Sequence, residues 1–543
     1  MSGRKHSNRG RPVHVVSETH EGLVRLMHSP SFYPHHPSSV ELIQTHISYV
    51  FLAGNRVYKV KKPVRFDFLD FSTLERRKHF CEEELRLNRR LAPTVYVSVE
   101  PITDEGPGGL VLGGTGPPVE YALHMKRLPE ERMLYRLLER GSADLSVMDA
   151  IARRICDFHR EADTGGAIDA LGGLDTIRRN NDENFEETRS YRDVTISAAA
   201  HSFLKDWVNS FLDRNRELFH RRVREHRIRD CHGDLHLEHI CLDGDDIVIF
   251  DCIEFKERFR YLDVAAEIAF LSMDLGSKGY HGHDRAFVDA YLRYSGDREI
   301  QKLLNFYRCY FAFVRGKVTS FRIDDPATAE KDRARIADEA SQYFDGAVRY
   351  AARLDTPALL ILSGLMGTGK SSLARRLADS LDAGIIRTDV LRKEMLGIQP
   401  ADRHHEPFGR GIYSDEISRE TYHRVLEQAG VRLASGETVI IDASFRKQEE
   451  RERARAIAKR QGADFLVIEC VCPEEEIRAR LDRRQRKGNE ASDGRWELYE
   501  SQKKSFEPLK DILPGEHVLV DTSRPLADSL MDALRRIRRL DRE

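Results

Sequence analysis

The sequence predicts two domains of different fold class, an α+β domain followed by an α/β domain with a parallel sheet. At 543 residues the chain is too long for one hydrophobic core, and ordinary domain sizes predict about two to four domains. Residues 47–60 form two β-rich runs around a Gly-Asn turn, and a charged helical pattern follows them. From residue 358 onward, short apolar runs alternate with helical patterns, which predicts a parallel sheet with helices on both faces.

Composition and charge narrow the class of protein. Hydrophobic residues make up 40% of the chain and charged residues 32%, which is typical of a folded globular protein. The 87 basic and 89 acidic residues give a net charge of −2, so the whole chain lacks the positive excess typical of nucleic-acid or anionic-membrane binding. No apolar run approaches the ~18 residues of a membrane span, and the polar start does not resemble a secretory signal. We expect a cytoplasmic protein that does not associate with membranes.

The eight cysteines are scattered along the chain and form no C-x-x-C pair. A zinc site or a disulfide framework would need closer grouping. We therefore expect small buried residues in a reducing compartment.

The domain limits are predicted from the change of pattern along the chain. Residues 1–20 are expected to form a disordered tail, residues 21–353 the first domain and residues 356–543 the second. A long helix predicted over 327–352 leads into the next strand without a Gly/Ser-rich or Pro-rich spacer. So short a joint predicts that the two domains pack against each other.

In the first domain, a lysine on a strand and a glutamate on a helix form the pattern of an ATP-phosphate ion pair. Lys59 lies in the second run of the hairpin, and Glu84 lies in the helix predicted over 73–91. Kinases use such a pair to hold the α- and β-phosphates. Lys61 or Glu83 could take these places, because lysine and glutamate are common at surfaces.

Two aspartates further along the chain supply the chemistry that this pair lacks. The run Cys231–Ile240, CHGDLHLEHI, reads as a tight loop around Asp234, and an apolar strand then ends in Asp251. A loop aspartate that takes a hydroxyl proton and a strand-end aspartate that holds Mg²⁺ are the minimum needed to move a γ-phosphoryl group. Asp263 opens the next predicted helix, as its cap or as a brace for the loop.

The pattern H-G-D-x-H-x-x-x-I followed by I-x-F-D resembles the aminoglycoside phosphotransferase family, a branch of the protein-kinase-like fold. The resemblance covers residues 21–353 and implies Asp234 as the catalytic base, Asp251 as the principal Mg²⁺ ligand, and Lys59 with Glu84 as the phosphate-side pair. Where the family has an asparagine as second metal ligand, this chain has His239. Imidazole can bind metals but Mg²⁺ prefers oxygen. We expect His239 as a metal ligand; a one-metal site, slow turnover or lost catalysis all remain open.

The second domain opens with a phosphate-binding motif. Residues 364–371, GLMGTGKS, fit G-x-x-x-x-G-K-[ST], with a buried strand predicted before them and a helix after them. The loop directs backbone N–H groups at phosphate oxygens, and the helix N-terminus adds its positive dipole end. Lys370 would reach the β- and γ-phosphates, and the Ser371 hydroxyl would hold Mg²⁺. The expected nucleotide-binding residues are Gly364, Leu365, Met366, Gly367, Thr368, Gly369, Lys370, Ser371 and Ser372.

Four more strands are predicted after this motif, at 383–389, 437–444, 465–471 and 517–521, with a helix over 410–434. The run at 437–444 resembles a Walker B strand and carries Asp442. Because parallel strands place their ligand at their carboxyl ends, we expect the motif and Asp442 to lie at one edge of the sheet.

Two groups of charged residues are candidates for the chemistry of this domain. Asp389 and Arg392 lie three residues apart on one face of a predicted helix. The basic run 478–487 reads either as a solvated helix or as a lid closing over the phosphates, and we favour the lid. An arginine that neutralises transition-state charge can be worth about 10³–10⁵-fold in rate.

Residues 356–543 resemble the small P-loop kinases related to polynucleotide kinases, zeta toxins and chloramphenicol phosphotransferases. The resemblance implies Asp389 as the substrate-activating base and Arg392 as an anchoring arginine. It further implies Arg480 and Arg484 as lid residues and Asp442 near the metal or the substrate.

The sequence thus predicts an ATP-dependent phosphotransferase with two ATP–Mg²⁺ sites and a small-molecule hydroxyl acceptor. The pairing resembles a bacterial family of predicted bifunctional proteins with an aminoglycoside phosphotransferase and an ATP-binding domain. Nucleic-acid ends are the less favoured acceptor, because only local runs such as 446–460 are basic. The alternative is a regulatory ATP-binding protein with a degenerate kinase-like domain and a P-loop ATPase switch. His239 favours it, while Asp234 and Asp251 count against it. The sequence predicts no oligomeric state.

Overall fold

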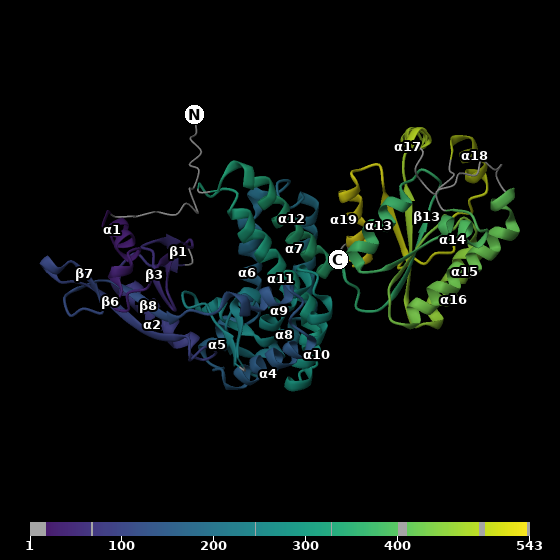
Figure 1. Cartoon of the computed structure of the whole chain (residues 1–543). Coiled ribbons are helices and arrows are strands. Elements are labelled where there is room, and N and C mark those ends of the chain that lie inside the picture. Colours follow the sequence, from purple (N-terminus) through teal and green to yellow (C-terminus); the bar gives the residue numbers. More distant parts are fainter. Residues whose placement is uncertain are drawn as a thin grey trace, which may run out of the picture. The chain divides into compact units, whose positions relative to one another are not determined.

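The computed structural model describes residues 18–66, 69–244, 246–326, 328–399, 410–487 and 495–539 (Figure 1). The predicted tail over 1–20 lies outside this part of the chain except for residues 18–20, which begin a helix. Contacts divide the chain into two compact units, one of residues 1–180 and 215–311 and one of residues 181–214 and 312–543. Contacts therefore group 181–214 and 312–353 with the P-loop part, while the domain limits at 353 and 356 stay predictions.

The first unit contains all the strands before residue 264 and most of the helices before residue 300. Its strands are β1 (Val40–Gln44), β2 (Ser48–Ala53), β3 (Arg56–Lys61), β4 (Arg65–Phe66), β5 (Leu69–Asp70), β6 (Tyr96–Asp104), β7 (Leu110–Leu112), β8 (Pro118–Lys126), β9 (Ile228–Asp230), β10 (Ile240–Asp243), β11 (Asp246–Ile249) and β12 (Tyr261–Asp263). Its helices are α1 (Glu18–Met27), α2 (Leu74–Asn88), α3 (Leu134–Glu139), α4 (Leu145–Glu161), α5 (Ala167–Gly172), α8 (Arg216–Arg224), α9 (Val264–Ser277) and α10 (His281–Ser295). Helices α6 (Leu174–Glu187) and α11 (Ile300–Phe321) begin in this unit and end in the second.

An antiparallel sheet forms the first layer of this unit, with strand order β1-β2-β3-β8-β6-β7. The predicted hairpin is confirmed: β2 and β3 pair with Ala53 opposite Arg56, so Gly54 and Asn55 form a two-residue turn. Gly54 has a φ of 65°, which glycine adopts at little cost. Alternation along β3 directs the side chains of Lys59 and Lys61 to the same face of the sheet.

Helix α2 packs against strands β6 and β8. It begins at Leu74 because the Thr73 side chain accepts a hydrogen bond from the backbone N–H of Arg76, so the helix predicted over 73–91 is confirmed with a shorter end. Its buried face carries Cys81, Glu84 and Leu87. A carboxylate on this face must find cationic partners, because an unpaired buried charge is very costly.

The basic run 214–229 includes α8. For such a run, the default expectation is that its arginines lie on a helix face exposed to solvent. Arg222 departs from it: its guanidinium is buried and donates hydrogen bonds of 2.8 and 2.6 Å to Asp263 and of 2.5 Å to Asp297. Its neighbour Arg224 is exposed and pairs with exposed Glu217 at 2.6 Å. One helix therefore carries both a structural ion cluster and ordinary surface charge.

The second unit contains a five-stranded parallel sheet among its described residues, with order β14-β15-β13-β16-β17. The strands are β13 (Ala358–Ser363), β14 (Gly384–Arg387), β15 (Val439–Asp442), β16 (Asp464–Val471) and β17 (His517–Asp521). The helices are α7 (Ala198–Arg214), α12 (Glu330–Ala352), α13 (Lys370–Leu381), α14 (Thr388–Met395), α15 (Asp415–Ala434), α16 (Gln448–Arg460), α17 (Glu474–Lys487), α18 (Trp496–Lys504) and α19 (Leu526–Ile537). All five predicted strands and the parallel sheet are confirmed.

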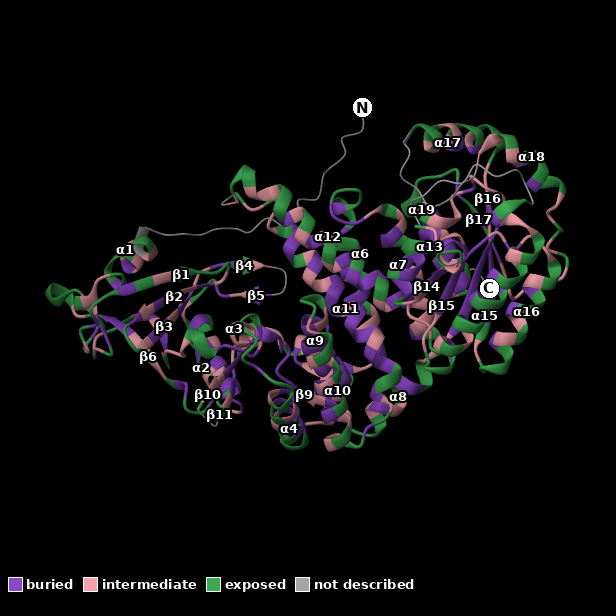
Figure 2. Ribbon diagram, turned by 45° about the vertical axis from the view of Figure 1, so that its right-hand side comes forward, coloured by how far each residue is buried: buried purple, intermediate pink, exposed green. Residues whose placement is uncertain are grey.

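Helices cover both faces of this sheet (Figure 1). Leu359, Ile361 and Val439 belong to a core cluster that includes Val425 and Ala429 of α15 and residues of α16. The alternate residues of these strands point to the other face, where α13 contacts β13 and β15. Figure 2 shows the strands buried, while α15 and α16 expose their outer faces.

For the helix predicted over 410–434, the predicted start is wrong. Helix α15 begins at Asp415, where the Ser414 side chain accepts a hydrogen bond from the backbone N–H of Ile417. Gly411, with a φ of 56°, precedes it in a short turn. The polar pattern before Ser414 therefore belongs to a turn and a cap. Within the described ranges, no helix is both long and apolar enough to cross a membrane.

We predict that Arg222→Ala destabilises the first unit by about 3–5 kcal/mol, because it leaves buried Asp263 without its cation and leaves Asp297 only the longer contact with Arg227, at 3.7 Å. Urea unfolding followed by intrinsic fluorescence measures the change. Arg224→Ala is the matched control, and its exposed ion pair predicts a loss of at most about 1 kcal/mol. Equal losses in the two variants would contradict a structural role for the buried cluster.

Candidate functional site

The first candidate site is built around the shared carboxylate of Glu84. Lys59 Nζ donates to Glu84 Oε1 at 2.7 Å, and Lys61 Nζ donates to Glu84 Oε2 at 2.6 Å. Glu83, the alternative, is on the outer side of α2 and pairs with Arg86 at 2.7 Å. Burial by itself would raise the pKa of Glu84, but the two ammonium groups outweigh it and lower the pKa. The pair expected at Lys59 and Glu84 thus lies together, and Lys61 adds a second cation.

Asp251 lies directly across from Lys59. Its Oδ1 accepts a hydrogen bond of 2.7 Å from Lys59 Nζ, and its backbone N–H donates to the Tyr96 hydroxyl at 3.1 Å. Asp251 has a φ of 64°, a left-handed conformation that is uncommon for a residue other than glycine. Burial alone would raise the pKa of Asp251, but Lys59 and His239 outweigh it and lower the pKa well below the usual range. The carboxylate is therefore ionised and held by Lys59, while Tyr96 holds the backbone of the same residue.

A third acidic group joins this network through Lys61. Lys61 Nζ donates to both Glu84 and Glu254, and all three side chains are buried. Burial and the charge of Glu84 raise the pKa of Glu254, although Lys61 opposes the change. With Asp251 and Asp234, the site holds four acidic groups and two lysines. The excess of acidic groups favours a bound cation.

Asp234 lies in the loop after β9, and its neighbours are imidazoles. His239 Nδ1 donates to the Asp234 carbonyl at 2.9 Å and lies 3.5 Å from Asp234 Oδ2, while His236 Nε2 lies 3.6 Å from Oδ2. Burial alone would raise the pKa of Asp234, but His236 and His239 outweigh it and lower it to about 2. The side chains of Asp234 and Asp251 are 34% and 41% exposed, so a substrate can reach both carboxylates.

Glu267 of α9 holds the loop in this conformation. Its Oε1 accepts N–H bonds of 2.8 Å from His232 and 2.7 Å from Gly233, and its Oε2 lies 2.7 Å from His159 Nε2. Gly233 has a φ of 84°, and a Cβ there would lie 2.7 Å from the Phe259 carbonyl oxygen, so only glycine fits. Glu267 thereby fixes the backbone one residue before Asp234.

Asp263 was expected either as a helix cap or as a brace for this loop. It is the cap: it accepts a hydrogen bond of 2.8 Å from the Ala265 N–H and pairs with Arg222. The brace is Glu267, which the sequence analysis did not identify. The sequence does carry a signal for this role, a single glutamate within the apolar stretch Val264–Leu271. A glutamate buried in such a helix needs several hydrogen-bond donors, which a nearby loop can supply.

The second candidate site is the loop between β13 and α13. Gly364, Gly367 and Gly369 have φ values of 135°, 80° and 82°, which curl the backbone as the motif requires. Lys370 Nζ donates to the Leu365 carbonyl at 2.7 Å. Burial lowers the pKa of Lys370, since the nearby acidic groups compensate only in part. The loop thus supplies its own acceptor for Lys370, the Leu365 carbonyl, and a phosphate oxygen would replace that carbonyl as acceptor.

Asp442 ends β15, the strand next to β13, and lies close enough to the Ser371 hydroxyl for that group to act on its pKa. Burial and the charge of Asp389 raise the pKa of Asp442, although Ser371 opposes the change. Asp442 Oδ2 is buried and, among described residues, has no hydrogen-bond partner; it lies 3.7 Å from Arg387 Nε. A hydroxyl and an under-satisfied carboxylate are hard oxygen donors, which fit Mg²⁺.

The other predicted residues of this site lie on α14 and α17. Arg387, which the sequence analysis did not identify, lies 3.6 Å from Asp389 Oδ2 as well as close to Asp442. Arg392 is buried and places its guanidinium 4.9 Å from the centre of the Tyr413 ring. Asp389, Asp442 and Ser371 are thus brought together, and Arg392 points to the turn before α15.

The two arginines of α17 differ in their contacts. Arg480 donates to Glu476 at 2.9 Å and to the Thr522 carbonyl at 2.6 Å, and one of its nitrogens would lie 3.2 Å from a Cβ at Gly369. Arg484 is close enough to Lys370 to lower its pKa. Both arginines therefore lie beside the phosphate-binding loop, as a lid would require.

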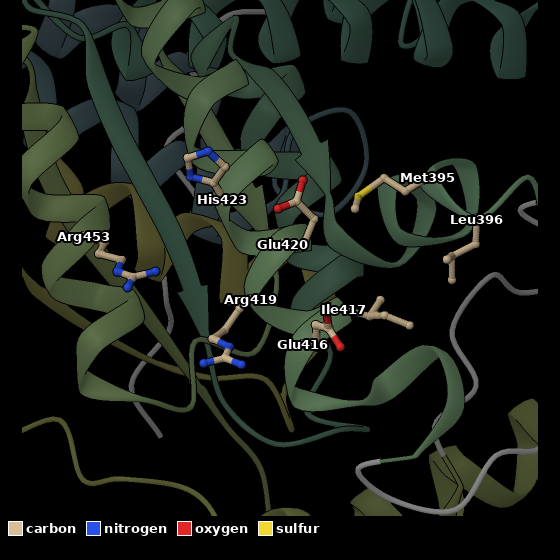
Figure 3. Close-up of a pocket in the computed structure, with 8 residues that line it drawn as sticks. All are labelled: Met395, Leu396, Glu416, Ile417, Arg419, Glu420, His423 and Arg453. Atoms are coloured by element: carbon tan, nitrogen blue, oxygen red, sulfur yellow. The ribbon is translucent and has the colours of Figure 1, made fainter.

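A separate hollow of about 530 Å³ is lined by residues of α15 and α16, by the end of α14 and by Leu396, which follows α14 (Figure 3). Glu416, Arg419, Glu420 and His423 line it from one face of α15. None of the residues predicted for catalysis or nucleotide binding lines it. It is therefore distinct from both candidate sites.

Comparison with known proteins assigns both halves of the chain. Residues 52–304 match the phosphotransferase enzyme family, and residues 359–509 match a family described as AAA domain. An uncharacterized protein of Mycobacterium tuberculosis (strain ATCC 25618 / H37Rv) is 32% identical over 432 residues, which are 79% of this chain and 83% of that protein. The shikimate kinase of Caldanaerobacter subterraneus subsp. tengcongensis is 28% identical over 136 residues, 23% of this chain and 78% of that enzyme. A gluconokinase structure from Sinorhizobium meliloti 1021 is 25% identical, covers 34% of this chain and 93% of its own, and has a TM-score of 0.25.

We predict that Glu267→Ala loosens the loop around Asp234 without unfolding the unit. Loss of the acceptor for two buried N–H groups costs about 1–3 kcal/mol. Amide exchange of residues 231–236, followed by mass spectrometry, should therefore accelerate about 5- to 150-fold. Glu238→Ala, in the same loop but with an exposed side chain, is the control. Unchanged exchange in Glu267→Ala would contradict the brace.

Proposed function

The chain belongs to the family that it shares with the Mycobacterium tuberculosis protein, and it joins a phosphotransferase domain to a P-loop kinase domain. From this premise we propose that the chain transfers the γ-phosphoryl group of ATP to hydroxyl acceptors, and that it does so at two separate sites. The observation that carries the proposal is the contact of Lys59 with both Glu84 and Asp251, beside the loop of Asp234. This arrangement supplies a phosphate-binding cation, an ionised metal-binding carboxylate and a base at one place.

At the first site, Asp234 accepts the proton of an acceptor hydroxyl as that oxygen bonds to the γ-phosphorus and the bond from the γ-phosphorus to the β,γ-bridging oxygen breaks. Lys59 orients the α- and β-phosphates, and Glu84 holds Lys59 in place. Asp251, with His239 beside it, would hold the metal ion that neutralises charge on the phosphates. The products are ADP and a phosphorylated alcohol.

At the second site, the loop 364–371 and Lys370 would bind the phosphates, and Ser371 with Asp442 would hold Mg²⁺. Asp389 is the candidate base, and Arg387 lies 3.6 Å from it. Arg392, Arg480 and Arg484 would bind the acceptor or close over the phosphates. The activity of a similar protein, shikimate kinase, supports a small hydroxy acid as acceptor here.

A regulatory protein is the second candidate function, and His239 is the observation that favours it. In that case the first unit would bind nucleotide without transfer, and hydrolysis at the P-loop would act as a switch. The ionised state of Asp234 and Asp251 and the intact Lys59–Glu84 pair argue for transfer.

A cytoplasmic location fits these sites, because ATP is a cytoplasmic substrate. All eight cysteines are free thiols, and Cys81, Cys156, Cys231, Cys241, Cys252, Cys309 and Cys470 are buried. This usage supports the proposed reducing compartment.

We predict that Asp234→Asn and Lys370→Ala remove different acceptor-dependent activities. Loss of a general base should reduce transfer at the first site about 10²–10⁴-fold. The measurement is ³²P transfer from labelled ATP to pooled sugars, hydroxy acids, aminoglycosides, nucleosides and 5′-hydroxyl oligonucleotides. The rate of ATP hydrolysis without acceptor is measured for each variant and subtracted.

Lys459→Ala, an exposed lysine of α16, is the control for the loss of a positive charge in the second unit. The two-site proposal would be overturned if Lys370→Ala lost all turnover while Asp234→Asn lost no turnover. The first unit would then be a nucleotide-binding regulator.

A further inference from the structure

We propose that Asp251 and His239 form a mixed oxygen–nitrogen metal site that selects a first-row transition cation such as Mn²⁺ over Mg²⁺. The inference deepens the proposed function of the first site, on which it rests, by naming its cofactor class. The proposal rests on the hydrogen bonds of His236 and His239, which show which nitrogen of each ring carries the proton.

The hydrogen bonds of His239 fix its neutral tautomer. His239 Nδ1 lies 2.9 Å from the Asp234 carbonyl oxygen, which only accepts, so Nδ1 carries the proton. In the neutral ring Nε2 then has a lone pair. This lone pair is the atom available to a metal ion, and the backbone of the catalytic loop sets its direction.

The Nε2 lone pair of His239 faces a carboxylate oxygen. His239 Nε2 lies 3.5 Å from Asp251 Oδ2, while the other oxygen of Asp251 accepts from Lys59. Two acceptor atoms at this distance repel each other unless a cation lies between them. Two atoms about 2.1 Å from a shared metal ion lie roughly 3.0–3.4 Å apart, for angles between octahedral and tetrahedral. The observed spacing therefore fits one shared ion after a small adjustment.

The donor types decide which cation this pair prefers. Mg²⁺ takes oxygen ligands in near-ideal octahedral geometry, whereas imidazole suits transition cations and carboxylate suits Mn²⁺ as well as Mg²⁺. The contrast lies within one chain, because Ser371 and Asp442 of the P-loop site offer oxygen alone. The two sites are therefore expected to differ in metal preference.

A rival position exists in the same loop. Ligand atoms of Asp234, His236 and His239 come within 4.8 Å of one another. However, His236 Nδ1 accepts a hydrogen bond of 3.3 Å from the Glu238 N–H, which places the proton of a neutral His236 on Nε2. His236 Nε2 then faces Asp234 as a donor. The rival group thus lacks the lone pair that a ligand needs, which leaves the pair Asp251 and His239.

Pulsed electron paramagnetic resonance of Mn²⁺ bound to the full chain tests this assignment. The sample contains Mn²⁺ and β,γ-methylene ATP, which has no nitrogen between its phosphates, and histidine labelled with ¹⁵N is compared with natural abundance. We expect a directly coordinated histidine nitrogen whose coupling changes with the label. Absence of any histidine coupling at saturating Mn²⁺ in the unaltered protein would overturn the proposal.

His239→Asn and His236→Asn are matched variants, because the same substitution is made at two positions of one loop. His239→Asn should remove the nitrogen coupling and lower the ratio of Mn²⁺ to Mg²⁺ affinity, measured by calorimetry, about 10- to 100-fold. His236→Asn should keep both. Loss of the coupling in His236→Asn with its retention in His239→Asn would assign the ion to the rival position instead.

These readouts do not depend on turnover. If no acceptor is phosphorylated while His239 coordinates Mn²⁺, the proposed function fails and the metal assignment stands. If transfer occurs without histidine coupling, the metal assignment fails and the proposed function stands.

Discussion

Glu84 is a buried carboxylate shared by two ammonium groups, and the first site depends on this interaction. An unpaired carboxylate at its position would be very costly, so α2 is stable against the sheet only with Lys59 and Lys61 directed toward it. Lys59 in turn holds Asp251, and Lys61 holds Glu254. The ion network therefore links a strand, a helix and the segment after β11. The geometry of the site follows from charge neutralisation in a buried space.

Backbone conformation sets the rest of the chemistry in both units. Gly233 within the loop around Asp234 and Asp251 after β11 both lie in left-handed conformations, and three glycines curl the phosphate-binding loop. Such conformations persist where the surrounding structure fixes them. In the first unit that support is Glu267, which binds two N–H groups of the loop. In the second unit it is the parallel sheet, which places the loop and Asp442 at the ends of adjacent strands.

The two candidate sites offer different ligand atoms to a metal ion. The P-loop site pairs a hydroxyl with a carboxylate, and the first site pairs a carboxylate with an imidazole. When His239 is compared only with the asparagine expected at its position, it suggests that the loop has lost a metal ligand. The orientation of its ring, with Nδ1 on the Asp234 carbonyl and Nε2 toward Asp251, is the observation from which we propose it as a ligand. The metal preference that we propose for the first site would tell the two halves of this chain apart.

The sequence by itself determined the two fold classes, the strands of the parallel sheet, the hairpin and the phosphate-binding loop, because each depends on local period and turn chemistry. It also determined the family of each half, through motifs in which glycine and charge have fixed spacing. Only the tertiary structure decided that Glu84 and not Glu83 is the buried acid, that Lys61 shares it, and that Glu267 rather than Asp263 braces the loop. These choices depend on which side of a helix meets the sheet and on partners distant in the chain, such as Lys59 with Asp251 or Arg387 with Asp442. No local pattern encodes such a distance.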